Sequence, residues 1–460
     1  MDMKLAVVIL AAGQGSRMHS AIPKVLHEIA GRPLLHHVID AARELQPEQI
    51  MVVHRHTNDL VQNACPDPDL TWVEQEQPQG TGHAVQCALS KLAEQIDRVL
   101  VLYGDVPLIQ PATLKSLLEK SVHGLGLLTL TLDDPNGYGR IKRTKSGRRV
   151  LGIVEQKDAN PDDLKICEVN TGIMVLPVDR ISDWLSRLSR KNSQNEYYLT
   201  DIVAMAADGG VSVQVAQPQQ AIEAAGVNNR QQLAQLERAK QQMQADSLML
   251  AGVTLQDPDR FDLSGQLHHG QDCTIAPNVV CEGEVTLGNR VRIGANTVLR
   301  NVQIEDDTVI LENCVLEDTL IGPGSRIGPF ARLRPGSKLA RETRVGNFVE
   351  IKNSRIGPGS KLNHLAYVGD SQIGREVNLG AGSITCNYDG ADKHKTVIGD
   401  HVFVGSNSAL VAPIEIGQGA TIGAGSVLNR YVPANALTLT RGQKKTIPDW
   451  VRPQKAGKKG

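Results

Sequence analysis

The fold of the first half of the chain follows from residues 5–18, LAVVILAAGQGSRM. The six apolar residues that open this stretch are rich in β-branched side chains, and such a run predicts a strand buried on both faces of a parallel sheet. The glycine-rich turn after it allows the backbone to approach phosphate groups closely. A signal peptide has a similar apolar core, but this run ends in glycines rather than in a cleavage site. We therefore expect a phosphate-binding loop at the end of a buried strand.

Further short β-rich runs alternate with helical patterns in the first half of the chain. The runs lie at 50–53, 98–102, 125–130 and 172–176. This alternation predicts βαβ units, and so an α/β fold with a doubly wound, mostly parallel, Rossmann-like sheet. Ligands of such sheets lie beyond the carboxyl ends of the strands. The glycine loop and Asp105 both fall at such ends.

The second half of the chain carries a six-residue repeat. After residue 230 the chain has 27 of its 43 glycines, and aliphatic residues recur at six-residue steps, as in Ile321, Ile327, Leu333, Leu339 and Val345. Three such repeats make one triangular coil, and stacked coils bury the aliphatic side chains against one another. We expect an all-β parallel β-helix whose corners suit glycine and small residues. A helical or disordered glycine-rich segment would not hold this spacing.

The chain divides into three segments by composition. Residues 229–250 have apolar side chains at helical spacing on a glutamine-rich background, which predicts a connecting helix between residues 1–228 and 251–460. Residues 385–396 break the six-residue register and predict a loop that leaves the wall of the β-helix. The chain ends in a short basic tail, which we expect to be solvated.

Composition excludes several classes of partner. The net charge is −1, so nothing favours nucleic acid or an anionic membrane, and no apolar run approaches the ~20 residues of a membrane span. The seven cysteines are scattered without a C-x-x-C pair, which favours reduced thiols over disulfides or structural zinc. We expect a cytoplasmic protein with small-molecule partners.

The glycine loop is not a complete dinucleotide fingerprint, because Met18 stands where the third glycine of G-x-G-x-x-G would fall. Arg17 and Lys24 supply positive charge for a polyphosphate instead. Asp105 suits a Mg²⁺ ion that neutralises phosphate charge, with Asn228 as a second oxygen ligand. An alternative role for Asp105 is to cap the helix that follows.

Gln75 and the Gly80-Thr81 turn admit two interpretations. They can read the edge of a base, or they can form an ordinary turn in which Thr81 caps the next helix. The residues alone leave these two roles equally open.

The order of the motifs resembles that of the sugar-1-phosphate nucleotidyltransferases. The motifs in chain order are LAAGQGSRM, PK, QGTGHA, YGDVPL, GYGRI, VEQKD, EVNTGI and GVNNR. The repeat resembles the left-handed β-helix of the hexapeptide acyltransferases. Together the two halves resemble the bacterial family of bifunctional N-acetylglucosamine-1-phosphate uridylyltransferase/glucosamine-1-phosphate N-acetyltransferases over nearly the whole chain.

This resemblance implies a uridylyltransferase domain at 1–228 and an N-acetyltransferase domain at 251–460. It implies a cytoplasmic homotrimer that uses Mg²⁺, acetyl-CoA and UTP to make UDP-N-acetylglucosamine, a precursor of peptidoglycan and lipopolysaccharide. In the first domain the catalytic charges would come from Arg17 and Lys24, and Mg²⁺ would be bound by Asp105 and Asn228. Nucleotide and sugar contacts would come from Leu10, Ala11, Ala12, Gly13, Lys24, Gln75, Gly80, Thr81, Tyr103, Gly104, Asp105, Gly139, Glu155, Asn170 and Asn228.

In the second domain the resemblance implies that His364 is the general base, a role that suits an imidazole near neutral pH. Our own hypothesis adds that Glu350 orients His364. The implied sugar-phosphate contacts are Arg334, Lys352, Tyr367 and Asn378. The implied acetyl-CoA contacts are Ala381, Asn387, Tyr388, Ser406, Ala424 and Arg441.

Two other classes of protein compete with this interpretation. In the first, the β-helix of a nucleotidyltransferase serves only assembly or regulation. His364, the inserted loop and the basic pair Arg334 and Lys352 disfavour that class, because a scaffold needs none of them. In the second, the chain is a β-helical binding protein without chemistry, which Asp105 and the glycine loop disfavour.

Overall fold

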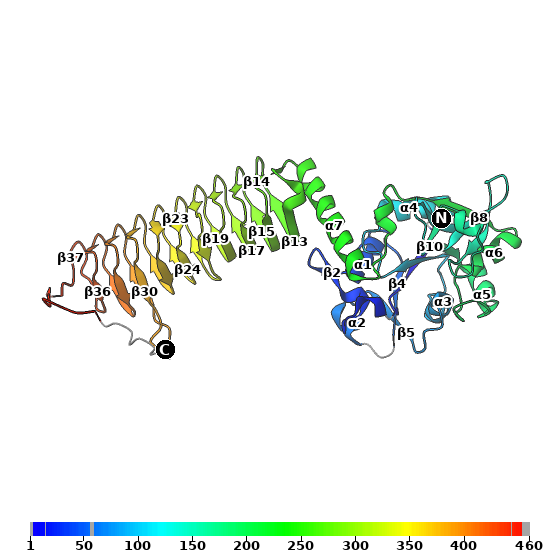
Figure 1. Ribbon diagram of the computed structural model, residues 1–460, viewed down its shortest axis with the longest axis horizontal. Coiled ribbons are helices and arrows are strands. Elements are labelled where there is room, and N and C mark those ends of the chain that lie inside the picture. The colour runs from blue at the N-terminus through cyan, green and yellow to red at the C-terminus, as the bar shows by residue number, and fades with distance from the viewer. Residues whose placement is uncertain (1–2, 14, 56–58, 443, 453–460) are drawn as a thin grey trace, which may run out of the picture. The chain divides into compact units, whose positions relative to one another are not determined.

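The computed structural model describes residues 3–13, 15–55, 59–442 and 444–452. The chain forms two compact units, Met1–Gln244 and Ala245–Gly460, which are drawn in Figure 1. The division falls inside helix α7 (Arg230–Leu250), so the helix expected at 229–250 belongs partly to each unit. No helix in the described part of the chain is long and apolar enough to cross a membrane.

The first unit is built on a mixed sheet with the strand order β11-β7-β10-β6-β1-β4-β5. Its centre is parallel and consists of β1 (Leu5–Leu10), β4 (Gln49–Arg55), β5 (Leu70–Gln75) and β6 (Arg98–Tyr103). The sequence predicted this parallel centre, and alternate residues of β1 enter two different hydrophobic cores, as in a doubly wound sheet.

The other strands of this sheet depart from a purely parallel order. β10 (Glu168–Pro177) runs antiparallel between β6 and β7 (Gly124–Thr131), and β11 (Ser212–Ala216) is parallel to β7. A hairpin of β8 (Arg140–Arg143) and β9 (Val150–Val154) extends from β10. A buried apolar run has the same pattern in either direction, which is why the sequence did not show that β10 is reversed.

Helices cover both faces of the sheet (Figure 1). One face packs against α1 (Leu34–Arg43), α2 (Asp59–Ala64) and α4 (Pro111–Lys120). The other packs against α3 (Thr81–Leu89), α5 (Val178–Ser186) and α6 (Asp201–Asp208). The short elements of this unit are 3-10 helices at Ser16–Met18, Lys24–Leu26, Asp163–Lys165 and Ala221–Ala224, and a ribbon of β2 (Glu28–Ile29) and β3 (Arg32–Pro33).

The second unit is a parallel β-helix, as the six-residue repeat predicts. Among its described residues, one sheet has 11 strands and the other has 15. Stacked side chains on successive coils are 17 or 18 residues apart, which corresponds to three hexapeptides per coil. The aliphatic residue of each repeat points inward and forms one continuous core.

The 11-stranded sheet takes one short strand from each coil. Its strands are β12 (Thr254–Leu255), β14 (Thr274–Ile275), β16 (Arg292–Ile293), β18 (Val309–Ile310), β20 (Arg326–Ile327), β23 (Arg344–Asn347), β26 (Lys361–His364), β29 (Asn378–Leu379), β32 (Phe403–Val404), β35 (Thr421–Ile422) and β37 (Leu437–Thr438).

The 15-stranded sheet wraps around a corner of the coil. Its first strands are long and span the corner: β13 (Phe261–His269), β15 (Val279–Leu287), β17 (Val298–Ile304) and β19 (Val315–Ile321). Beyond β19 the sheet splits into two rows of short strands. One row is β22 (Lys338–Leu339), β25 (Arg355–Ile356), β28 (Ser371–Ile373), β31 (Thr396–Ile398) and β34 (Ile414–Ile416). The other is β21 (Arg332–Leu333), β24 (Glu350–Lys352), β27 (Tyr367–Gly369), β30 (Ile384–Cys386), β33 (Ala409–Val411) and β36 (Val427–Leu428). A 3-10 helix, Pro258–Arg260, precedes β13.

The insertion in the repeat lies between two strands of this wall. The insertion lengthens one coil, as the pairing in the 11-stranded sheet shows. Lys361 pairs with Asn378 at the usual spacing between coils, but Asn378 pairs with Phe403, which lies further along the chain because the intervening coil contains the insertion. The loop outside the wall spans residues 387–395, since the ends of the predicted break belong to β30 and β31.

The corners differ partly from the expectation of glycine and small residues. Glycines such as Gly359 and Gly382 have positive φ there, and many other corner positions are asparagine or aspartate. Phe330, Phe348 and Leu365 also have positive φ, on three successive coils, although bulky residues rarely adopt it.

Candidate functional site

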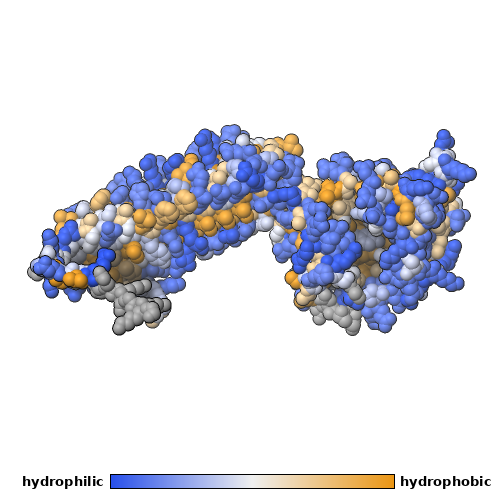
Figure 2. Space-filling model, viewed as in Figure 1, coloured by the Kyte–Doolittle hydropathy of each residue, from blue (hydrophilic) through white to orange (hydrophobic). Residues whose placement is uncertain are grey.

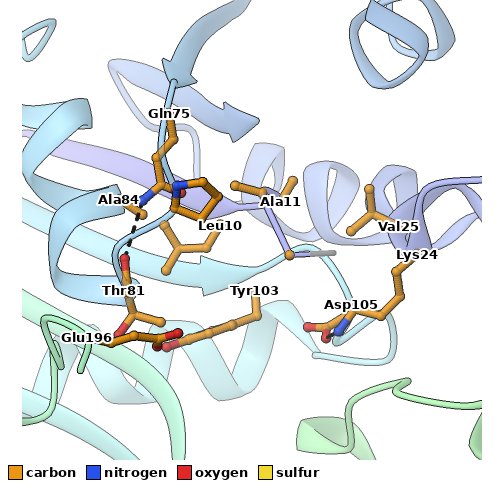
Figure 3. A pocket seen from close by; sticks show the side chains of 14 residues that line it. Leu10, Ala11, Lys24, Val25, Gln75, Thr81, Ala84, Tyr103, Asp105 and Glu196 are labelled. Carbon is orange, nitrogen blue, oxygen red and sulfur yellow. Dashed lines mark hydrogen bonds and ion pairs between the residues drawn. The ribbon is translucent and has the colours of Figure 1, made fainter. Parts of the chain in front are cut away.

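The first unit contains a pocket of about 500 Å³ at the carboxyl ends of its central strands (Figure 3). Many of the residues that the sequence assigned to the nucleotide line it together. The lining consists of Leu10, Ala11, Ala12, Gly13, Lys24, Val25, Gln75, Pro78, Gly80, Thr81, Ala84, Tyr103, Asp105 and Glu196. Sequence reasoning missed Glu196, because no motif among those recognised includes it.

Cationic side chains lie against oxygen ligands at one end of the pocket, which Lys24 and Asp105 line, and beside it, where Arg17 and Asn228 lie. Lys24 forms an ion pair with Asp105, and Figure 3 shows the two side chains meeting. Arg17 donates from Nη2 to Asn228 Oδ1 at 3.0 Å. The backbone carbonyl of Asp105 accepts from Val227 N–H at 2.9 Å, which holds the segment before Asn228 beside it. The four residues expected to handle phosphate and metal therefore lie together.

The alternative role of Asp105 as a helix cap is wrong. The helix that follows, α4, begins at Pro111 with Gln110 as its N-cap residue. Asp105 is instead held beside Lys24, where its carboxylate faces the pocket.

The oxygen donors at this end suit a magnesium ion in part. Asp105 offers a carboxylate and Asn228 an amide oxygen, both hard donors of the kind that Mg²⁺ prefers. Within the residues that the structure describes, no group of three or more His, Cys, Asp or Glu side chains is placed to hold a metal. The two donors therefore fit an ion that takes most of its ligands from substrate phosphates and water.

Gln75 and the turn at Gly80 form the opposite end. Gln75 is 2% exposed, and its Nε2 lies 3.4 Å from the Gly80 carbonyl oxygen. Gly80 has φ +109°, and a Cβ there would lie 2.5 Å from the carbonyl oxygen of Tyr197. Thr81 does not cap α3, since its Oγ1 accepts from Leu199 N–H at 3.1 Å. The turn is thus fixed by the segment at 197–199, which excludes the helix-cap interpretation for Thr81.

The expected sugar contacts lie together beside the pocket. A Cβ on Gly139 would be 3.4 Å from Glu155 Oε2, and the Gly139 carbonyl accepts from Asn170 N–H at 2.9 Å. Thr200, which the sequence did not single out, donates to Glu155 Oε1 at 2.9 Å. Burial raises the pKa of Glu155. Tyr103 lines the pocket near this group, and burial, together with the nearby Glu155, raises its pKa.

In the β-helix, the expected sugar-phosphate cations lie on adjacent coils of the 15-stranded sheet. Leu333 pairs with Ile351, and Lys352 pairs with Gly369, so Arg334, Lys352 and Tyr367 follow one row. Arg334 donates to Glu350 Oε1 at 2.8 Å, and Lys352 Nζ lies 3.7 Å from Asp370 Oδ2.

The inserted loop joins this row through Asp370. Asn387 donates to Asp370 Oδ2 at 2.5 Å, and hydrogen bonds and nearby lysines outweigh burial in lowering the pKa of Asp370. Lys393 is one of those lysines, and it pairs with Tyr388 in an isolated bridge. The sequence analysis did not select Lys393, although a basic residue within the predicted insertion could have been proposed as a phosphate contact.

His364 lies on the other sheet, at the end of β26. Its Nδ1 is 3.0 Å from Asn347 Oδ1, because β23 and β26 pair these two residues directly. With the amide oxygen accepting, Nδ1 carries the proton and Nε2 is the free basic nitrogen. Within one chain Glu350 does not orient His364 as hypothesised, since it lies on β24, beyond the corner at Phe348, and accepts from Arg334.

The remaining expected residues follow His364 along the coils. Asn378 is on β29 of the same sheet, and Ala381, Ser406 and Ala424 occupy the turns after β29, β32 and β35. Arg441 donates to the Ala424 carbonyl at 2.6 Å. The residues expected for acetyl transfer are therefore divided between two sheets of the β-helix.

Comparison with known proteins agrees with both units. Residues 7–135 match the family described as MobA-like NTP transferase domain, and residues 395–430 match the bacterial transferase hexapeptide family. A curated protein of Idiomarina loihiensis named "Bifunctional protein GlmU" is 56% identical and is covered fully, as is this chain. Proteins of the same name from Marinobacter nauticus and Chromobacterium violaceum are 52% and 51% identical, over 98% of this chain and 99% of theirs. The chain belongs to the GlmU family of bifunctional proteins.

Proposed function

We propose that the first unit transfers UMP from UTP to N-acetylglucosamine 1-phosphate. The observation that carries this proposal is the cationic end of the pocket, where Lys24 meets Asp105, together with the contact of Arg17 with Asn228 beside it. A phosphate oxygen of the sugar phosphate attacks the α-phosphorus of UTP, and pyrophosphate leaves as the bond to the β-phosphate breaks. A phosphate monoester is already a competent nucleophile, so the protein needs no base for this step.

The work of this site is positioning and charge neutralisation. Arg17 and Lys24 bind the triphosphate and stabilise charge on the departing pyrophosphate. Mg²⁺, when bound, is held by Asp105 and Asn228 and neutralises phosphate charge. Gln75 and the Gly80 turn read the base, while Gly139, Glu155 and Asn170 read the sugar.

For the second unit, the function that fits best is acetyl transfer from acetyl-CoA to glucosamine 1-phosphate. Arg334 and Lys352 attract the sugar phosphate, since each is a basic side chain on the same row of coils. Nε2 of His364 removes a proton from the substrate ammonium group, and the free amine attacks the thioester carbonyl. The carbon–sulfur bond breaks, the attacking nitrogen gives up a second proton to the departing sulfur, and coenzyme A leaves as the thiol. The product is the sugar phosphate that the first unit consumes.

A homotrimer completes this second site. His364 and Arg334 lie on different sheets of one β-helix, so a second copy is the simplest way to place both kinds of residue around one substrate. At one corner, Phe330, Phe348 and Leu365 have exposed fractions of 49%, 55% and 60%. The rings of the two phenylalanines stack, with their centroids 5.3 Å apart. Figure 2 shows a hydrophobic band along part of this unit. Such an exposed apolar row favours an interface between copies.

Two half-reactions test these assignments separately. Full-length protein is incubated with UTP, N-acetylglucosamine 1-phosphate and Mg²⁺ for pyrophosphate release, and with acetyl-CoA and glucosamine 1-phosphate for thiol release. Asp105→Ala should abolish only the first reaction, and His364→Ala only the second. Pyrophosphate release without thiol release by the unaltered protein would leave the β-helix as an assembly module. The absence of both would refute the proposal.

The location we propose is the cytoplasm. All seven cysteines are free thiols, which is the state that a reducing compartment maintains.

A further inference from the structure

The side-chain amide of Gln75 is held on one side by two neighbours. Its Nε2 lies 3.0 Å from His83 Nδ1 and 3.4 Å from the Gly80 carbonyl oxygen, the contact drawn as a dashed line in Figure 3. A backbone carbonyl can only accept, so the amide atom facing Gly80 is the nitrogen. Both hydrogens of Nε2 are then used. The amide atom left for a ligand is Oε1, which can only accept a hydrogen bond.

The ring of His83 strengthens this orientation, because its contact with Nε2 is the shorter of the two. Nδ1 accepts from Gln75 only when it carries no proton, so the proton of the neutral ring lies on Nε2. The sulfur of Cys87, one helical turn along α3, is 3.7 Å from Nε2 and serves as its weak acceptor. Burial lowers the pKa of His83 and raises that of Cys87, which favours a neutral ring beside an uncharged thiol.

We propose that His83 is a positioning residue that selects the base of the nucleotide by fixing the orientation of the Gln75 amide. The inference rests on the uridylyl transfer proposed above and concerns the same pocket. An acceptor held toward the base fits the N3–H of uracil and opposes the unprotonated N3 of cytosine. Without an acceptor at His83, only the longer 3.4 Å contact with the Gly80 carbonyl holds the Gln75 amide, so the amide turns more readily and presents its NH₂ group, which fits cytosine.

The test compares UTP with CTP as the nucleotide substrate of full-length protein, with N-acetylglucosamine 1-phosphate and Mg²⁺. The readout is the ratio of the two kcat/KM values. His83→Ala should lower this ratio by about tenfold or more, the scale of one mismatched buried polar contact. His83→Asp should preserve the ratio, because its carboxylate supplies only acceptors and lies in the first turn of α3, where the helix dipole favours negative charge.

Two further variants control the comparison. His123→Ala changes an exposed histidine of the same unit and should leave the ratio unaltered. In Gln75→Glu the two oxygens are equivalent acceptors, so adding His83→Ala to this variant should no longer reduce the preference for UTP. A smaller folded fraction of His83→Ala does not change the readout, because the ratio compares two substrates in the same preparation.

The outcomes separate the two levels of inference. Absence of uridylyl transfer with UTP in the unaltered protein refutes the function of the pocket before any variant is made. Equal losses with UTP and CTP in His83→Ala, or an undiminished effect of His83→Ala in the Gln75→Glu background, overturn the role of His83 alone. A ratio that falls in His83→Ala and is restored in His83→Asp supports it.

Discussion

Replacing Lys24 with methionine should remove most uridylyl transfer while leaving the fold intact. The Lys24 and Asp105 side chains are only 13% and 16% exposed, so the ammonium group is largely withdrawn from water before a substrate arrives. A fixed charge in such a site stabilises the developing charge of the transition state by about 3 kcal/mol, and its loss lowers kcat by roughly 10²–10³. Methionine retains the apolar part of the side chain, so packing around it is kept.

Pyrophosphate release measures this loss, and acetyl transfer in the same preparation serves as an internal reference. Acetyl transfer depends on residues of the second unit and should be unchanged in Lys24→Met. Lys120→Met is a matched control, because Lys120 is exposed at the end of α4, and it should retain both activities. A Lys24→Met protein with near-normal kcat for uridylyl transfer would refute the role assigned to the cationic end of the pocket.

Three further substitutions probe other parts of the two sites. Asn347→Leu removes the acceptor 3.0 Å from His364 Nδ1 and should lower the kcat of thiol release by roughly tenfold. An unchanged kcat would refute the role of Asn347 in orienting His364. Gly80→Ala forces a side chain into a φ of +109° against Tyr197, and urea denaturation should show a loss of about 1–3 kcal/mol with a raised KM for UTP. Glu155→Gln removes a carboxyl whose pKa is raised in the folded state, so wild type loses stability relative to this variant as pH rises through that pKa. The variant should therefore melt higher at neutral pH, with the difference vanishing below the unfolded-state pKa of glutamate, and a constant difference would contradict the sign.

Much of the architecture could be predicted from local patterns. β1 is a β-branched apolar run that ends in glycines, and the inward residues of the β-helix recur every six positions. The reversed direction of β10 could not be predicted, because its apolar pattern is the same for parallel and antiparallel neighbours.

The separation of Glu350 from His364 within one chain has a specific geometric cause. The chain turns a corner at Phe348, whose φ is positive, so Asn347 stays on the sheet of His364 while Glu350 moves to the next one. A count of residues along the repeat does not show where the corner falls when a phenylalanine occupies it. Contacts between distant segments, such as that of Glu155 with Thr200, carry no local pattern at all.

The most direct test of the bifunctional assignment follows an isotopic label through both units. Full-length protein is incubated with glucosamine 1-phosphate, UTP, Mg²⁺ and acetyl-CoA labelled in its acetyl group, and the nucleotide products are analysed by mass spectrometry. We expect UDP-N-acetylglucosamine carrying the labelled acetyl group, with release of coenzyme A and pyrophosphate. The bifunctional assignment would be contradicted if UDP-N-acetylglucosamine were absent or unlabelled while glucosamine 1-phosphate and acetyl-CoA remained unconsumed.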